Sequence, residues 1–217
     1  MQFKDGATVY TSQGEEVGRV DRVVMDPVSK EVTHLVVRKG ILLTEDRVVP
    51  LEFVASARED QVRLRKLVAD LEDLPHFEVE QYVHLSQKEI ERSSYPAGFA
   101  PPLYWYPSAG ASPIGYPGYP GAAFVVQVER NIPDFTVALK AGAKVIASGG
   151  DRVGEVAEVI TDPEDNRATH FVISKGVLFK YKVLIPVLWI SGLQEDEVHL
   201  NVGPEMLADL PEYQGQA

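Results

Sequence analysis

The chain has 217 residues, of which 32 are acidic and 21 are basic, so its formal net charge is -11. This negative charge repels phosphate backbones and argues against direct binding to nucleic acid. The absence of cysteine excludes disulfide bonds, thiolate metal sites and thiol nucleophiles. The start of the chain is not signal-like, and no run of roughly 18 apolar residues is found, so we expect a cytoplasmic protein without a transmembrane segment.

The first predicted strand covers residues 17 to 23. Val17, Val20 and Val23 recur every three residues, a spacing more typical of a helix than of a strand. We nevertheless predict a strand, because β-branched residues dominate the segment and a bulge at Gly18 would shift the alternation of its side chains.

Two further segments of the first half show strand patterns. Residues 33 to 37 are apolar on both faces, as in a central strand that is covered on both sides. Residues 61 to 65 alternate polar and apolar side chains, as in a half-buried strand. Short strands separated by turns indicate a small antiparallel barrel. Leu71 and Leu74, followed by a proline, predict a short helix that closes one end of it.

The middle of the chain differs in composition from both ends. Residues 93 to 123 contain seven prolines, five glycines and no charge, so they are predicted to be a flexible linker rather than a packed domain. Strands are predicted on either side of it, at residues 77 to 85 and 124 to 128. We therefore predict one domain over residues 1–92 and a second over residues 124–217.

The linker contains the sequence P-P-L-Y-W-Y-P. Such a segment is typical of a polyproline helix that docks in an aromatic-lined groove, and its P-P-x-Y string resembles a WW-domain ligand. The alternative is a spacer whose aromatic side chains cover an apolar patch on one barrel. The candidate partner-binding residues are Pro101, Pro102, Tyr104, Trp105 and Tyr106.

The second half of the chain repeats the first. Residues 142 to 214 align with residues 6 to 78 without a gap, so that DPVSKEVTHLVVRKG reappears as DPEDNRATHFVISKG, 136 residues further on. A long repeat in only two copies indicates tandem domains rather than a solenoid. We interpret the shared turn formers, glycines and strand histidines as structural positions. They are Gly14, Gly18, Asp26, Pro27, His34, Gly40 and Pro50 in the first copy, and Gly150, Gly154, Asp162, Pro163, His170, Gly176 and Pro186 in the second.

The ordered motifs G-A-x-V, S-x-G-x-x-V-G-x-V, D-P, T-H-[LF]-V-[VI], K-G-x-L and [VI]-P occur twice, and this set resembles the PRC-barrel family. The resemblance implies an all-β fold of two small antiparallel PRC-like β-barrels, each closed by a short C-terminal helix and joined by the Pro/Gly/aromatic linker. The family includes the cytoplasmic part of the photosynthetic reaction-centre H subunit and the C-terminal domain of a ribosome maturation factor. In both, the resemblance implies an assembly surface rather than a catalytic fold.

Each copy also contains Ser, Asp and His in the chain order of an α/β-hydrolase triad. A triad needs a serine on a strained elbow beside the histidine, and no G-x-S-x-G sequence is present. We therefore favour turn and capping roles for the serine and aspartate. The residues concerned are Ser12, Asp26 and His34, with their counterparts Ser148, Asp162 and His170.

No sequence pattern indicates a metal or cofactor site. His34 and His170 each stand alone in a predicted strand, whereas a metal site needs three or four convergent ligands. We interpret both as hydrogen-bonded strand histidines rather than as ligands or pH sensors. The acidic clusters lie in turns, where they offer at most weak and nonspecific contact with divalent cations, and the glycine-rich turns lack the patterns of phosphate-binding loops.

These observations predict a non-catalytic protein-interaction or assembly adaptor that binds one or more protein partners and uses no cofactor. An alternative is a factor of ribosome assembly or RNA processing that acts through a protein partner, and a third is a hydrolase. Homo-oligomerisation and pairing of the two barrels within one chain both stay open at this point.

Overall fold

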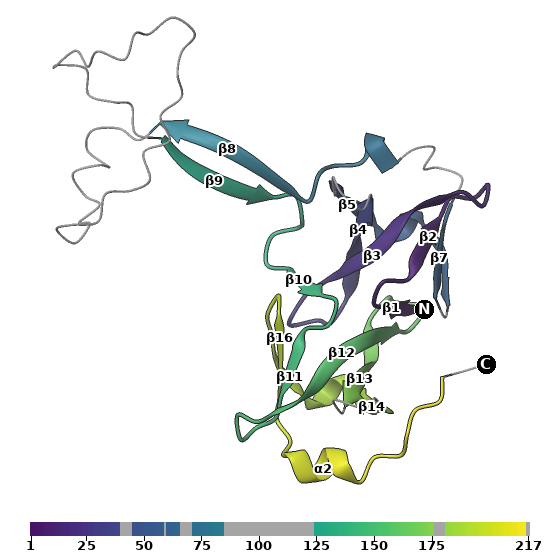
Figure 1. The fold of residues 1–217 in the computed structure, drawn as a ribbon, viewed down its shortest axis with the longest axis vertical. Coiled ribbons are helices and arrows are strands. Elements are labelled where there is room, and N and C mark those ends of the chain that lie inside the picture. The colour runs from purple at the N-terminus through teal and green to yellow at the C-terminus, as the bar shows by residue number, and fades with distance from the viewer. Residues whose placement is uncertain (40–44, 59, 66–70, 85–123, 176–180, 216–217) are drawn as a thin grey trace, which may run out of the picture. The chain divides into compact units, whose positions relative to one another are not determined.

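The structure of the protein is a computed structural model, shown in Figure 1. It forms two compact units, one made of Met1–Phe77 together with Asn131–Ala217, and the other of Glu78–Arg130. We call the two parts of the larger unit the first half and the second half. The structure describes residues 1–39, 45–58, 60–65, 71–84, 124–175 and 181–215.

The first half is built on a sheet with the strand order β5-β4-β3-β2-β7-β6. β4 lies between β5 and β3, and its consecutive residues Leu35, Val36 and Val37 are all buried, as predicted for a strand covered on both faces. β7 alternates exposed and buried residues as predicted. The strands are β2 (Thr8–Tyr10), β3 (Glu16–Met25), β4 (Val32–Lys39), β5 (Glu45–Pro50), β6 (Val54–Arg58) and β7 (Gln61–Leu64).

The second half has the same strand order, β14-β13-β12-β11-β16-β15. The internal repeat of the sequence therefore reflects a repeated fold, and the prediction of a mostly β protein with two similar halves is confirmed. The strands are β11 (Lys144–Ile146), β12 (Arg152–Thr161), β13 (Ala168–Lys175), β14 (Tyr181–Pro186), β15 (Ile190–Leu193) and β16 (Glu197–Leu200).

The three-residue spacing of valines in β3 comes from two bulges. The ladder between β2 and β3 skips Val17, and the ladder between β3 and β4 skips Asp21. Each bulge adds one residue to the usual two-residue alternation, so Val17, Val20 and Val23 all face the core. The predicted strand with a bulge beside Gly18 is confirmed.

The prediction of purely antiparallel barrels is wrong in one respect. β2 runs parallel to β7, and β11 runs parallel to β16. Alternation of side chains marks a strand without revealing its direction, so the sequence pattern could not separate the two arrangements. Among the described residues, the two strands at the ends of each path do not pair with each other, so neither sheet is a continuously hydrogen-bonded barrel.

The second half has a short helix, α2 (Pro204–Ala208), at the leucines where a closing helix was predicted, and this helix buries Leu207. In the first half, the equivalent leucine spacing gives only the 3-10 turn η2 (Leu71–Asp73), and residues 66–70 lie outside the described residues. Two further 3-10 turns follow the proline that ends a strand in each half, η1 (Leu51–Phe53) and η3 (Val187–Trp189).

The two halves exchange a strand with each other. β1 (Gln2–Lys4) pairs with β12, so that Phe3 lies opposite Val159. β10 (Val137–Lys140) pairs with β3, so that Leu139 lies opposite Val23. Each half thus gives its first strand to the sheet of the other. The sequence repeat left the pairing of the halves open, and the strand register shows that they pair within one chain.

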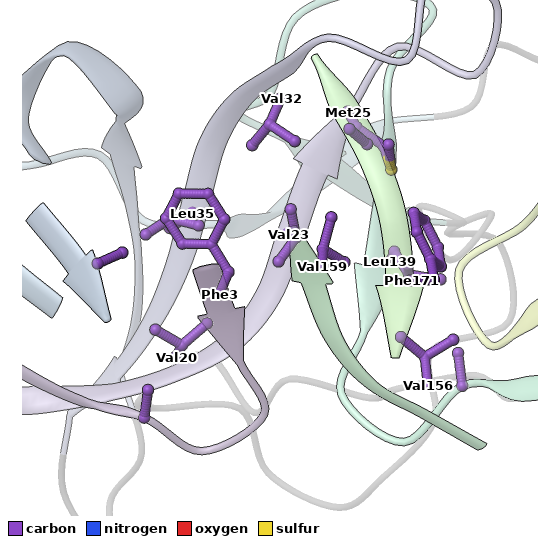
Figure 2. Packing of buried hydrophobic residues seen from close by; sticks show 14 of the residues in the cluster. Phe3, Val20, Val23, Met25, Val32, Leu35, Leu139, Val156, Val159 and Phe171 are labelled. Carbon is purple, nitrogen blue, oxygen red and sulfur yellow. The ribbon is translucent and has the colours of Figure 1, made fainter. Parts of the chain in front are cut away.

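The exchange creates one hydrophobic core that contains residues of both halves. Figure 2 shows Phe3 and Leu139, from the exchanged strands, among side chains of β3, β4, β12 and β13. Hydrogen bonds add to this seam in equivalent pairs: the Val32 amide donates to the Asn166 carbonyl at 3.0 Å, and the Ala168 amide donates to the Lys30 carbonyl at 2.8 Å.

The smaller unit contains an antiparallel hairpin of β8 (Glu78–His84) and β9 (Phe124–Arg130). Both strands were predicted from the sequence, but their pairing with each other was not. The predicted linker at residues 93–123 and its five candidate partner-binding residues lie outside the described residues, as do Gly40 and Gly176.

Candidate functional site

The serine, aspartate and histidine of each copy do not form a catalytic triad. Ser12 lies in the turn that precedes β3, whereas Asp26 follows the other end of β3 and His34 lies opposite Val24 near that end. The ten residues of β3 separate the two ends by about 25 Å or more at the usual rise of a strand. The equivalent residues of the second half are separated by β12 in the same way.

The aspartates stabilise turns. Asp26 Oδ1 accepts hydrogen bonds from the backbone amides of Val28 at 2.6 Å and Ser29 at 3.0 Å. These bonds favour the charged carboxylate and lower the pKa of Asp26. Asp162 Oδ1 accepts the equivalent bond from Glu164 at 2.8 Å.

Glycine is needed at the repeated positions for two different reasons. Gly14 and Gly150 have φ angles of 90° and 89°, which side chains on other residues disfavour. Gly18 and Gly154 have ordinary backbone angles, but a Cβ atom there would lie 2.6 Å from a carbonyl oxygen of the neighbouring strand. The glycines thus serve turns and close strand contacts.

His34 differs from the expectation of a hydrogen-bonded strand histidine. Its Nδ1 atom is buried and makes no hydrogen bond to the described residues. Burial lowers the pKa of His34, although the Glu52 carboxylate acts in the opposite direction. Across the described ranges, no group of three or more His, Asp and Glu side chains is placed to hold a metal ion.

Charged side chains bridge the two halves beside β10. Arg22 of β3 forms an ion pair with Glu195 of the second half, and its guanidinium lies 4.9 Å from the ring centre of Phe77. Arg38 contacts Asp46 through two hydrogen bonds of 3.0 and 3.1 Å and Asp21 at 2.8 Å. Burial raises the pKa of Asp21 despite the nearby guanidiniums. Because these charges neutralise one another, we assign them a structural role.

The position equivalent to Arg22 in the second half carries the opposite charge. Glu158 accepts hydrogen bonds from Lys182 at 2.5 Å and from Gln2 of the exchanged strand β1. Lys182 belongs to the same half as Glu158, so on this side the halves are joined by the hydrogen bond from Gln2 rather than by an ion pair. This difference shows that the two halves are not interchangeable in their chemistry.

A groove of about 660 Å³ lies where β1 and the end of β6 meet the second half. We call it the open groove. Its apolar wall includes Ile160 and Leu184, and its rim includes His170, Tyr213 and Arg58. The volume falls in the range of sites that bind small molecules or short peptides. Arg58 belongs to β6, so both halves contribute to the groove.

The equivalent surface of the first half is closed, and we call it the covered face. Its residues form a small buried cluster against which Ile132 packs. Val24, Val48 and Phe77 of this cluster are at most 2% exposed. Their counterparts Ile160, Leu184 and Tyr213 are only half-buried.

The sequence model of the PRC-barrel domain matches residues 5–71 and again residues 141–207. The chain belongs to the PRC-barrel family. No curated protein matches it.

The two PRC-barrel matches cover β2 to β7 and β11 to β16 but not the groove as a whole. The exchanged strands β1 and β10 precede the matched segments, and Phe77, Ile132 and Tyr213 lie outside them. Within the described part of this PRC-barrel protein, every helix falls short of the length and hydrophobicity needed to cross a bilayer.

Sequence reasoning missed the open groove, although one signal of it was present. The aligned copies place Tyr213 where the first copy has Phe77, and Gln2 where the second has Ala138. An amphipathic or polar residue at a position that is buried and apolar in the other copy indicates that this position meets solvent or a partner.

Proposed function

We propose that this PRC-barrel protein is a non-catalytic assembly adaptor that binds other proteins. The observation that carries the proposal is the open groove, an apolar-walled surface with a polar rim that the equivalent part of the same chain keeps covered. Concave surfaces with apolar walls and a few polar groups are the usual places for ligand binding. Of the repeated residues of catalytic type, Asp26 and Asp162 stabilise turns, and His170 lies on the rim of this groove.

The linker supports the same proposal through a different feature. Residues 101 to 107 carry prolines and aromatic side chains without charge, a composition that suits docking on a partner. An open groove on a compact unit and a docking segment on the same chain would bind two sites of one assembly. Joining two weak sites in one chain raises the effective concentration of the second.

Affinity capture with the full-length protein tests this function. The immobilised protein is exposed to an extract of the source organism, and retained proteins are identified by mass spectrometry. Binding of each purified candidate is then measured by calorimetry. An unrelated acidic protein of similar net charge serves as the control for electrostatic retention. We expect at least one partner that binds stoichiometrically; retention of nothing beyond this control contradicts the proposal.

A further inference from the structure

The covered face shows which kind of chain segment fits this surface. Residues 131 to 136 run across it before entering β10. The Asn131 amide donates to the Phe77 carbonyl at 3.0 Å, and Asn131 Nδ2 donates to the His76 carbonyl at 2.7 Å. Ile132 packs on the apolar cluster, and Pro133 follows it. The cover is thus an aliphatic residue followed by proline, anchored by hydrogen bonds from the backbone and the side chain of Asn131.

The open groove presents the same backbone framework without such a cover among the described residues. β1 pairs with β12 in the register in which β10 pairs with β3. In addition, the Tyr213 amide donates to the Lys182 carbonyl at 2.7 Å, as the Phe77 amide donates to the Asp46 carbonyl at 2.8 Å, so the backbone of Tyr213 is held beside the groove in the equivalent way. Because both surfaces are built from equivalent strands, a segment with the shape of residues 131 to 136 suits the groove as well.

The rim of the groove adds a preference in charge. Arg58 is exposed there, and the residue that aligns with it in the second half, Gln194, is neutral. A cation at the rim favours a partner with an acidic side chain close to its apolar anchor. The covering segment itself has Asp134 directly after Pro133.

We propose that the open groove binds an extended segment of a partner protein, with an aliphatic residue followed by proline and then an acidic residue. The partner segment covers Ile160 and Leu184 in the way that Ile132 covers Val24 and Val48. This assignment rests on the proposed adaptor function and names the surface and the ligand chemistry through which it operates.

A synthetic peptide provides the direct test. The probe is a fluorescently labelled peptide with the sequence RNIPDFT, which copies residues 130–136. It is titrated into the full-length protein, and binding is followed by fluorescence anisotropy. We expect saturable binding, and a loss of at least about tenfold in affinity when the isoleucine of the peptide is replaced by aspartate, since the apolar contact is removed.

Two matched variants of the protein locate the binding site. Leu184→Glu places a charge in the wall of the groove, whereas Leu188→Glu makes the same change at a leucine that is 82% exposed and outside the groove. We expect the first to weaken peptide binding at least about tenfold and the second to leave it unchanged. Circular dichroism checks that both variants fold. If Leu184→Glu does not, Tyr213→Ala at the rim replaces it with the same expected loss.

Four results would overturn the assignment. They are no binding of the peptide at millimolar concentration, equal binding by the two glutamate variants, and concentration-dependent dimers that Leu184→Glu abolishes. The fourth is binding that occurs only after residues 101–107 are replaced by glycine and serine, because the chain itself would then occupy the groove.

The capture experiment separates this assignment from the proposed function. If the wild-type protein captures no partner, the adaptor function fails whether or not the peptide binds. If a partner is captured equally by Leu184→Glu and Leu188→Glu, the adaptor function stands and the groove is not its docking site.

Discussion

Phe3→Ala tests the exchange of strands between the two halves. Phe3 is 1% exposed and lies in the three-residue strand β1, opposite Val159 of the second half. Truncation of a buried phenylalanine typically costs about 3 to 5 kcal/mol, because apolar contacts are lost and a cavity is left. The free energy of unfolding of a natural protein is only about 5 to 15 kcal/mol. We therefore expect a large fall in stability from one residue near the start of the chain.

Urea unfolding followed by circular dichroism measures this loss. The control is Phe135→Ala, the same change at a side chain that is 93% exposed, for which we expect a change within about 0.5 kcal/mol. If Phe3→Ala does not fold, Phe3→Leu should retain the fold with a loss of about 1 kcal/mol.

Amide hydrogen exchange then shows which part of the protein loses stability. The Thr161 amide of β12 donates to the Met1 carbonyl at 2.8 Å, so its protection should fall in Phe3→Leu and stay unchanged in Phe135→Ala. An unchanged free energy of unfolding in Phe3→Ala, or unchanged protection of Thr161, would show that β1 does not pair with the second half and would refute this reasoning.

Three further predictions concern the close strand contacts, the buried histidine and the seam. Gly18→Ala should lower the free energy of unfolding by about 1 to 3 kcal/mol, because the new Cβ atom would lie 2.6 Å from a backbone carbonyl oxygen. The control is Gly149→Ala, whose Cβ atom would have its nearest neighbour at 3.6 Å. In the same urea titration, this control should change the free energy of unfolding by less than about 0.5 kcal/mol. Burial lowers the pKa of His34 from 6.5, so protonation favours the unfolded chain and stability should fall as the pH drops from about 6.5 towards the folded-state pKa. His34→Gln should remove this part of the dependence when urea midpoints at pH 5 and pH 7 are compared, and an identical pH dependence in the variant would contradict the assignment. Arg22→Ala should lower the free energy of unfolding by about 3 kcal/mol, since it removes one member of a largely buried ion pair. A double-mutant cycle with Glu195→Ala should give a coupling energy of roughly 0.5 to 3 kcal/mol. A coupling energy of zero would show that the pair does not join the halves.

The strands could be predicted because their signals are local. A run of apolar residues indicates β4, and strict alternation of polar and apolar residues indicates β7. Even the irregular spacing of Val17, Val20 and Val23 could be interpreted once a bulge was allowed. The repeat then transferred each of these predictions to the second half.

The exchange of strands could not be predicted from the same signals. β1 has only three residues, too few to show a period, and its partner Ile160 lies far along the chain from Gln2. The parallel pairing of β2 with β7 was missed because side-chain alternation is the same in both strand directions. Such features depend on contacts between distant segments rather than on the pattern within one.

The candidate site was missed because sequence reasoning looked for similarity between the copies. The open groove depends on a difference between them: Tyr213 and Leu184 are half-buried where Phe77 and Val48 are buried. Both exchanges replace an apolar or aromatic residue by a similar one, so the sequence alone does not show that no described residue covers the open groove as Ile132 covers the other face.

The reciprocal strand pairing has a consequence for the making of the protein. β1 leaves the ribosome before β12, because Thr161, the hydrogen-bond partner of Met1, follows it by 160 residues. At a translation rate of about 5 to 20 residues per second, the N-terminal strand waits roughly 8 to 30 s for the sheet that receives it. A nascent chain that stalls before β12 has been synthesised thus leaves this strand without its native partner, however well the remainder of the first half has folded.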